Sequence, residues 1–175
     1  QKLGSYENAL LNFERALKLS PDDFGARYSK IMSLASYVPQ WHIPMMNDLP
    51  RNEAYLKALE ANVTKATHVL EIGTGSGLLA MIAARCGAKR KVLTCEVVPT
   101  VAKMARKIIR DNGYEDLVSV LNKRSTEIEI GVDMPCKADV IVSEILSNEF
   151  LGEGVLETIE DARSRLLAPG GIMIP

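Results

Sequence analysis

The feature that most constrains the fold is an alternation of short β-rich runs and helical runs from residue 67 onward. Helices are predicted at residues 77–86, 99–112 and 153–167. Five runs are predicted to be strands: "THVLEI", "KVLTCE", "LVSVL", "ADVIVS" and "GIMIP". Such alternation is typical of an α/β fold, a parallel sheet with helices on both faces. Ligands of these folds bind at the carboxyl ends of the strands.

The first part of the chain has helical spacing throughout. Apolar residues in "GSYENALLNFERALKLSP", residues 4–21, recur with the period of an amphipathic helix. Residues 22–37 are expected to form a second helix that begins at an aspartate. Five residues also keep the spacing of the second helix of a tetratricopeptide repeat: Gly4, Ala9, Phe13, Ala16 and Pro21. A generic amphipathic helix is the alternative interpretation.

Composition narrows the function classes. The 175 residues carry a formal net charge of −1 without a basic tail, so nucleic acid is not supported as a main partner. Cys86, Cys95 and Cys136 are scattered, so we expect no metal site and a reducing compartment, cytoplasmic or nuclear. No apolar run is long enough for a membrane span, and no signal peptide is visible. Because the chain begins in mid-pattern without Met, we expect a piece of a longer protein.

A glycine loop follows the first predicted strand in "VLEIGTGSGLLAMIA". Gly73, Gly75 and Gly77 allow a tight turn and close approach of a ligand to the backbone. The third glycine comes one residue early for the dinucleotide-binding spacing, and the acid Glu71 would repel a pyrophosphate. An acid favours a cationic ligand instead. The pattern ExGxGxG therefore favours S-adenosylmethionine over NAD.

A second acid, Glu96, ends the second predicted strand, about 20 residues after the loop. An acid at this distance accepts hydrogen bonds from ribose hydroxyls in nucleoside-binding sheets. NAD enzymes place an acid there too, so Glu96 indicates a nucleoside ligand but does not distinguish S-adenosylmethionine from NAD. The alternative is a solvated acid at a strand end.

An acidic loop, "SEILSNEFLGEG" at residues 143–154, follows the fourth predicted strand. It contains Glu144, Glu149 and Glu153 and no basic residue. It is either a solvated turn or a cradle for a cation. A guanidinium is planar and always protonated, and two carboxylates can bind it through charge-assisted hydrogen bonds. They would then fix one of its nitrogens in position for reaction.

Three motifs, in this order, resemble the protein arginine N-methyltransferases, a family of class I methyltransferases with a Rossmann-like sheet. They are "WHIPMMNDLPRNEAY", the glycine loop, and two glutamates nine residues apart, Glu144 and Glu153, as in the family's double-glutamate hairpin. "NKRSTEIEIGVDMPCKAD" and "LGEG" are most similar to the seventh member, and "WHxxMxND" with the preceding helix to the ninth. The resemblance covers about residues 37–175.

This resemblance implies a domain organisation. Residues 1–36 would be a tetratricopeptide-like helical remnant, and residues 37–62 would form N-terminal helices that cover the cofactor. Residues 63–175 would form the domain that binds S-adenosylmethionine. The family's C-terminal β-barrel, with a loop that completes the active site, is not among these residues, so we expect the isolated chain to turn over poorly.

The resemblance also implies which residues bind the cofactor. Arg51 would bind its carboxylate, Glu96 its ribose, and the turn at residues 125–127 would border its adenine. The implied cofactor-binding residues come from four segments: His42, Met45 and Arg51; Glu71, Gly73, Gly75 and Gly77; Glu96; and Ser125, Thr126 and Glu127. Among them, His42 and Met45 would flank the methyl-transfer end.

The implied activity is methyl transfer from S-adenosylmethionine to a guanidino nitrogen of arginine in a protein, with Glu144 and Glu153 as the catalytic pair. The helical repeats would offer a surface for further protein partners. One alternative is a class I methyltransferase that acts on a small molecule or another side chain. Another is a protein-binding scaffold with a vestigial cofactor site. Ser147 replaces an aspartate of the seventh member, which leaves the degree of methylation open.

Overall fold

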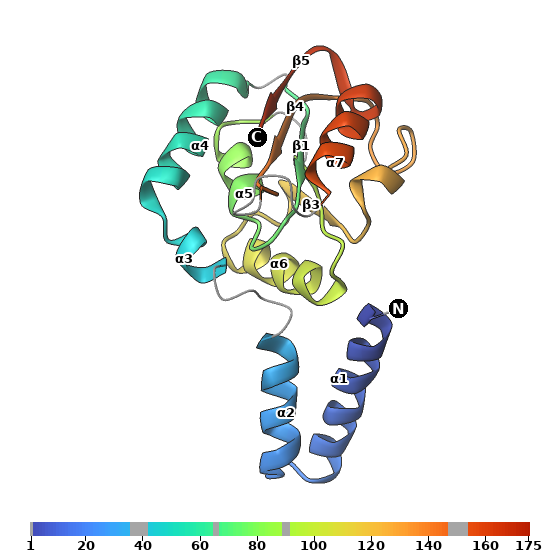
Figure 1. Ribbon diagram of the computed structural model, residues 1–175. Coiled ribbons are helices and arrows are strands. Elements are labelled where there is room, and N and C mark those ends of the chain that lie inside the picture. Colours follow the sequence, from blue (N-terminus) through green and yellow to red (C-terminus); the bar gives the residue numbers. More distant parts are fainter. Residues whose placement is uncertain (1, 36–41, 65–66, 89–91, 147–153) are drawn as a thin grey trace. The chain divides into compact units, whose positions relative to one another are not determined.

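The computed structural model describes residues 2–35, 42–64, 67–88, 92–146 and 154–175. The chain divides into two compact units, Gln1–Asn47 and Asp48–Pro175. The first unit contains α1 (Lys2–Leu19), α2 (Phe24–Ala35) and the short α3 (His42–Met46). The first two form a hairpin (Figure 1), and the backbone N–H of Ala26 donates to Asp23 Oδ1 at 2.8 Å, which caps α2 as predicted. Both predicted helices are confirmed, and the tetratricopeptide assignment stays a prediction.

The second unit is built on a five-stranded parallel sheet in the order β3-β2-β1-β4-β5. Its strands are β1 (Val69–Ile72), β2 (Val92–Cys95), β3 (Val118–Leu121), β4 (Ala138–Ser143) and β5 (Leu167–Ile174). The register pairs Ile72 with Cys95 on one side and with Ser143 on the other. The α/β class and the parallel sheet expected from the sequence are confirmed.

Helices cover both faces of this sheet, with α4 and α5 on one side and α7 on the other (Figure 1). One core cluster joins α4 (Leu49–Asn62), α5 (Leu78–Arg85) and α6 (Pro99–Asp111) to strand residues such as Val69 and Val140. The other joins Ile128, directly after the turn η1 (Ser125–Glu127), to the alternate strand residues Leu70 and Ile141. It also includes the π-helical η2 (Ala162–Leu166), which follows α7 (Val155–Asp161). Successive strand residues point to opposite faces, so each strand contributes to both cores.

The C-terminal part of the sheet differs from the sequence prediction. The last helical segment ends at residue 166 instead of 167, and β5 begins at Leu167 instead of residue 171. Residues 167–170 read "LAPG", which has no strand periodicity. They nevertheless join the sheet, since Leu167 pairs with Ala138 across an irregular register. Pairing with the neighbouring strand therefore overrode the local signal of proline and glycine.

The helix α4 begins at a well-defined cap. The Asp48 side chain accepts a hydrogen bond from the backbone N–H of Arg51 at 3.1 Å, and Pro50 lies in the first turn. This cap places Arg51 at the start of the helix. Among the described residues, no helix combines the length and apolar character that a membrane crossing requires.

Candidate active site

The predicted site residues of the second unit follow the carboxyl ends of neighbouring strands. Gly73 follows β1, Glu96 follows β2, and Glu144 follows β4. Because β1 lies between β2 and β4 in a parallel sheet, all three positions meet at one edge. Between β1 and β4 the strand order reverses, and open α/β sheets bind ligands at this switch point.

The loop after β1 requires its glycines. Gly73, Gly75 and Gly77 have φ values of 89°, 51° and 83°, in the left-handed region that other residues rarely adopt. A Cβ at Gly73 would lie 2.9 Å from Ile145 Cγ2, and one at Gly77 would lie 2.9 Å from the side chain of Ile109. The side chains of Ile145 and Ile109 therefore leave no room for a side chain at Gly73 or Gly77.

Glu96 is fixed against this loop. Its two carboxylate oxygens accept hydrogen bonds from the backbone N–H groups of Gly75 at 3.2 Å and Val98 at 2.9 Å. Asn122 donates from Nδ2 to the backbone oxygen of Glu96 at 2.7 Å. Only 9% of Glu96 is exposed. The structure thus brings together the acid and the glycine loop that the sequence predicted for a nucleoside.

Glu71 lies in the core between the sheet and α5, and 1% of it is exposed. Burial raises the pKa of Glu71 to about 8, although hydrogen bonds from the Thr94 side chain and the Ala80 backbone act in the opposite direction. Thr94 is in turn hydrogen-bonded to Thr74 of the loop, with 2.7 Å between their hydroxyl oxygens. The sequence argument treated Glu71 as a charged carboxylate, whereas its burial favours the neutral acid near neutral pH.

Replacing Glu71 by glutamine is expected to flatten the pH dependence of stability. The folded-state pKa of Glu71, about 8, lies above the ordinary glutamate value of 4.5. The folded protein therefore keeps a proton that the unfolded chain releases, and its stability is greatest below the unfolded pKa and declines as the pH rises through about 8. The slope is at most about 1.4 kcal/mol per pH unit. Urea unfolding between about pH 5 and pH 9 measures it.

The matched control for this prediction is Glu157→Gln, because Glu157 is exposed on α7. This variant should reproduce the wild-type dependence of unfolding free energy on pH. If Glu71→Gln and wild type gave parallel curves across the same range, the folded protein would not hold the extra proton.

A second cluster joins the start of α4 to the end of β4. Arg51 Nη2 lies 2.9 Å from Glu144 Oε2, and the two side chains are 18% and 20% exposed. The Arg51 guanidinium also stacks over the Tyr55 ring, 5.1 Å from its centroid. The resemblance had implied separate partners for these residues, the cofactor carboxylate for Arg51 and the substrate guanidinium for Glu144. In the structure they bind one another.

Tyr55 links this cluster to the backbone of the sheet. Its hydroxyl lies 3.2 Å from the backbone oxygen of Ser143 and 2.8 Å from that of Pro175, and these two carbonyls share its one proton. Burial raises the pKa of Tyr55 to about 12, with a further increase from the charge of Glu144. The hydroxyl therefore remains a donor over the whole physiological pH range.

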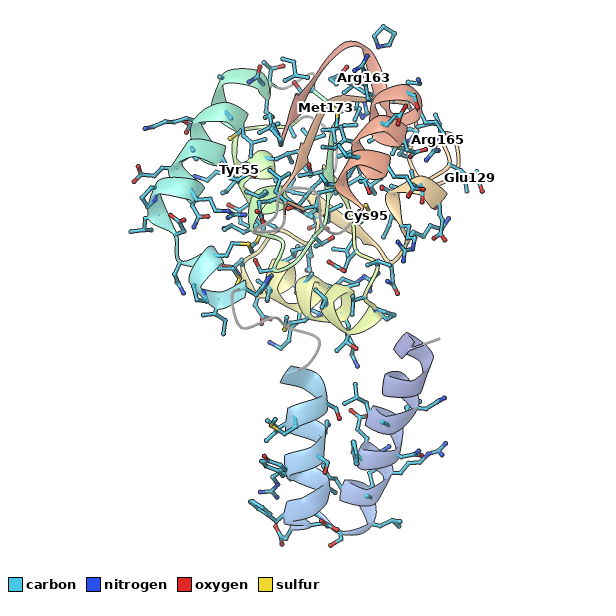
Figure 2. The ribbon with its side chains drawn as sticks, in the orientation of Figure 1. Tyr55, Cys95, Glu129, Arg163, Arg165 and Met173 are labelled. Atoms are coloured by element: carbon cyan, nitrogen blue, oxygen red, sulfur yellow. The ribbon has the colours of Figure 1, made fainter. Side chains whose placement is uncertain are left out.

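The turn after β3, at η1, is fixed by a residue far along the chain. Arg165 donates to the backbone oxygens of Ser125 at 3.1 Å and Ile128 at 2.8 Å, and it forms an ion pair with Asp161. Figure 2 labels Arg165 on the same side of the molecule as Glu129. Ser125 is buried, whereas Thr126 and Glu127 are exposed. The predicted adenine border is thus a turn held by hydrogen bonds from Arg165.

Sequence reasoning missed both Tyr55 and Arg165. Tyr55 had a visible signal, because it lies four residues after Arg51 on a predicted helix and such residues are neighbours on the helix surface. Arg165 had none, since it lies 40 residues from Ser125.

The described structure does not test the roles of three predicted site residues. His42 and Met45 lie on α3 in the first unit, and their roles stay predictions. Glu153 lies outside the described residues, as does Glu149, so the pairing of Glu144 with Glu153 also stays a prediction. Within the described ranges, no three His, Cys, Asp or Glu residues form a group that could hold a metal ion.

Comparison with protein families places these features in context. Residues 51–175 match the family described as ribosomal protein L11 methyltransferase (PrmA). The whole chain is 42% identical, over 177 aligned positions, to 49% of the arginine N(omega)-methyltransferase of Streptomyces achromogenes subsp. streptozoticus. Over 77% of its length it is 43% identical to protein arginine N-methyltransferase 7 of Oryza sativa subsp. indica, and it covers 20% of that protein.

A solved structure shares the fold at similar identity. The PRMT1 enzyme–prozyme heterotetrameric complex of Trypanosoma brucei with AdoHcy superposes with a TM-score of 0.68 at 35% identity. The match covers 78% of this chain and 42% of that chain. The chain therefore spans about half the length of the Streptomyces relative and about a fifth of the Oryza relative.

Proposed function

The chain belongs to the methyltransferase family described as ribosomal protein L11 methyltransferase, and we propose that its protein methylates arginine. The methyl donor is S-adenosylmethionine, and the acceptor is a guanidino nitrogen of arginine in a protein. Relatives named for arginine methylation at 42% and 43% identity support this proposal. They are longer than this chain, so the activity is proposed for the full-length protein.

The observation that carries the proposal is the contact between Glu144 and a guanidinium. Glu144 already binds the guanidinium of Arg51 at 2.9 Å, beside the glycine loop and at the strand end where ligands of this fold bind. A carboxylate in this position can accept charge-assisted hydrogen bonds from a substrate arginine in the same manner. This contact of Glu144, the first acid of the acidic loop, supports the interpretation of that loop as a cation site.

The residues present fit the cofactor. The positive-φ glycines carry no side chain at three positions of the loop, and one carboxylate oxygen of Glu96 accepts from the backbone N–H of Gly75 in that loop. These are the groups that a nucleoside with a methionine tail requires, namely close backbone approach and an acceptor for ribose hydroxyls. When bound, S-adenosylmethionine supplies the electrophilic methyl group.

The chain's own residues would bind the cofactor and orient the acceptor. Arg51 offers a cation for the carboxylate of the cofactor, and Glu96 accepts from its ribose. Glu144, together with Glu153 as a proposed second carboxylate, holds the acceptor guanidinium so that one nitrogen faces the methyl group. Such positioning supplies much of the rate in reactions between two bound reactants.

A second candidate acceptor is free arginine. The relative that matches the whole chain, including α1 and α2, is named for arginine and not for a protein. The Glu144 carboxylate would bind a free or a peptide-borne guanidinium equally, because the side chains are the same.

The test uses the full-length protein with S-adenosylmethionine and either an arginine-rich peptide or free arginine. Mass spectrometry of the products should show methyl groups on arginine residues of the peptide. Methylation of free arginine alone would establish the second candidate. If neither arginine form were methylated while S-adenosylmethionine still bound, arginine would not be the acceptor.

A further inference from the structure

A single side chain, Tyr55, contacts Arg51 and the backbone of the residue directly before Glu144. Its ring lies under the Arg51 guanidinium, and its hydroxyl donates to the backbone oxygen of Ser143, the residue directly before Glu144. Figure 2 labels Tyr55 on α4. One residue thus fixes the cation proposed for the cofactor and the strand end that carries the carboxylate proposed for the acceptor.

The hydroxyl makes a second bond that adds to this constraint. It lies 2.8 Å from the backbone oxygen of Pro175, just after β5, so α4 is joined to the ends of two adjacent strands. Strand ends that lead into loops are less constrained than strand centres, because their pairing stops there. A shared donor at β4 and β5 holds the exit of β4, and hence the starting point of the acidic loop, in one position.

The ring and the hydroxyl have separable effects. The ring is attracted to a guanidinium through its negatively charged face, which favours one orientation of Arg51. The hydroxyl bonds to backbone oxygens, whereas the contact with Arg51 is made by the ring. Removing one leaves the other in place, so substitutions at Tyr55 can distinguish cofactor binding from acceptor alignment.

We infer that Tyr55 is a positioning residue for methyl transfer, which orients Arg51 through its ring and the β4 end through its hydroxyl. The inference rests on the proposed function for the identity of the acceptor. A positioning residue of this kind contacts neither the cofactor nor the acceptor. It acts through Arg51 and through the backbone that precedes Glu144.

The test compares Tyr55→Phe and Tyr55→Leu in the full-length protein. Tyr55→Phe keeps the ring, so the cofactor dissociation constant should stay within about twofold, while kcat/KM for the arginine peptide falls about tenfold, as for one lost hydrogen bond. Tyr55→Leu removes ring and hydroxyl, so the cofactor dissociation constant should also rise about three- to fivefold. Calorimetry and methylation kinetics provide the two readouts.

The matched control is Tyr114→Phe. Tyr114 is likewise partly buried against an apolar core cluster, but it precedes β3 and so lies toward the opposite edge of the sheet. Both of its readouts should match wild type. A merely structural role for Tyr55 would lower the active fraction and leave the cofactor constant of properly folded Tyr55→Leu unchanged, which would overturn the inference.

The experiment distinguishes a wrong acceptor from a wrong role for Tyr55. If the wild-type protein methylated no arginine, the acceptor would be wrong, but the cofactor constants would still decide the role of the ring. A normal cofactor constant in Tyr55→Leu would overturn the inference in that case too.

Discussion

Glu144→Gln is expected to lower kcat/KM for arginine methylation by at least about 100-fold. Glutamine keeps the shape of the side chain but loses the charge that binds a guanidinium. The structure shows this interaction directly, in the 2.9 Å contact between Glu144 and Arg51. Methylation kinetics on an arginine peptide measure the loss.

Cofactor binding should not be weakened by Glu144→Gln. Arg51 loses a carboxylate partner in Glu144→Gln and becomes more available to the carboxylate of S-adenosylmethionine. The cofactor dissociation constant is therefore expected to be unchanged or lower, as measured by calorimetry. Glu157→Gln, at an exposed site on α7, should behave as wild type in both assays. Activity retained in Glu144→Gln would exclude Glu144 from acceptor binding.

Gly77→Ala is expected to destabilise the protein by about 2–4 kcal/mol and to weaken cofactor binding. Gly77 has φ 83° at the start of α5, which costs a residue with a Cβ about 1–2 kcal/mol. A Cβ there would also lie 2.9 Å from Cγ1 and Cδ1 of Ile109, which is 2% exposed and has little room to move. Relief of this overlap requires the loop to shift, so the backbone that faces the ligand shifts with it.

The control variant is Gly113→Ala. Gly113 has a similar φ, 78°, but a Cβ there would meet nothing within 4 Å. Gly113→Ala therefore adds only the cost of a left-handed backbone conformation, and the free energy of unfolding should fall by only about 1–2 kcal/mol. Chemical denaturation of both variants separates the two contributions. Equal losses would show that the contact with Ile109 has no energetic effect.

Much of the fold was predictable because its signals are local. The strands were predicted from short β-rich runs, and the division of Val69 and Leu70 between two cores then follows from the strand period. The glycine loop was also visible, since positive φ angles need particular residues at particular positions. The start of β5 was not predictable, because "LAPG" enters the sheet only through pairing with β4.

The candidate site was predictable as a set of positions but not as a set of contacts. The sequence placed Arg51 and Glu144 in motifs whose order resembles that of a family, and it placed Glu96 at the end of the second predicted strand. It could not show that Arg51 and Glu144 bind one another, because the segments that carry them are brought together only by the sheet. The same holds for Tyr55, whose bond to Ser143 joins residues 88 positions apart.

The sequence by itself therefore determined the order of strands and helices, the turn that approaches the ligand, and the acids available at the strand ends. These depend on interactions between residues that are close in the chain. The tertiary structure alone decided which distant side chains meet and how deeply each is buried. Burial raises the pKa of Glu71 to about 8, and a long-range contact gives Glu144 its guanidinium partner. Solvation and Coulomb energies depend on all surrounding atoms, most of which come from other parts of the sequence.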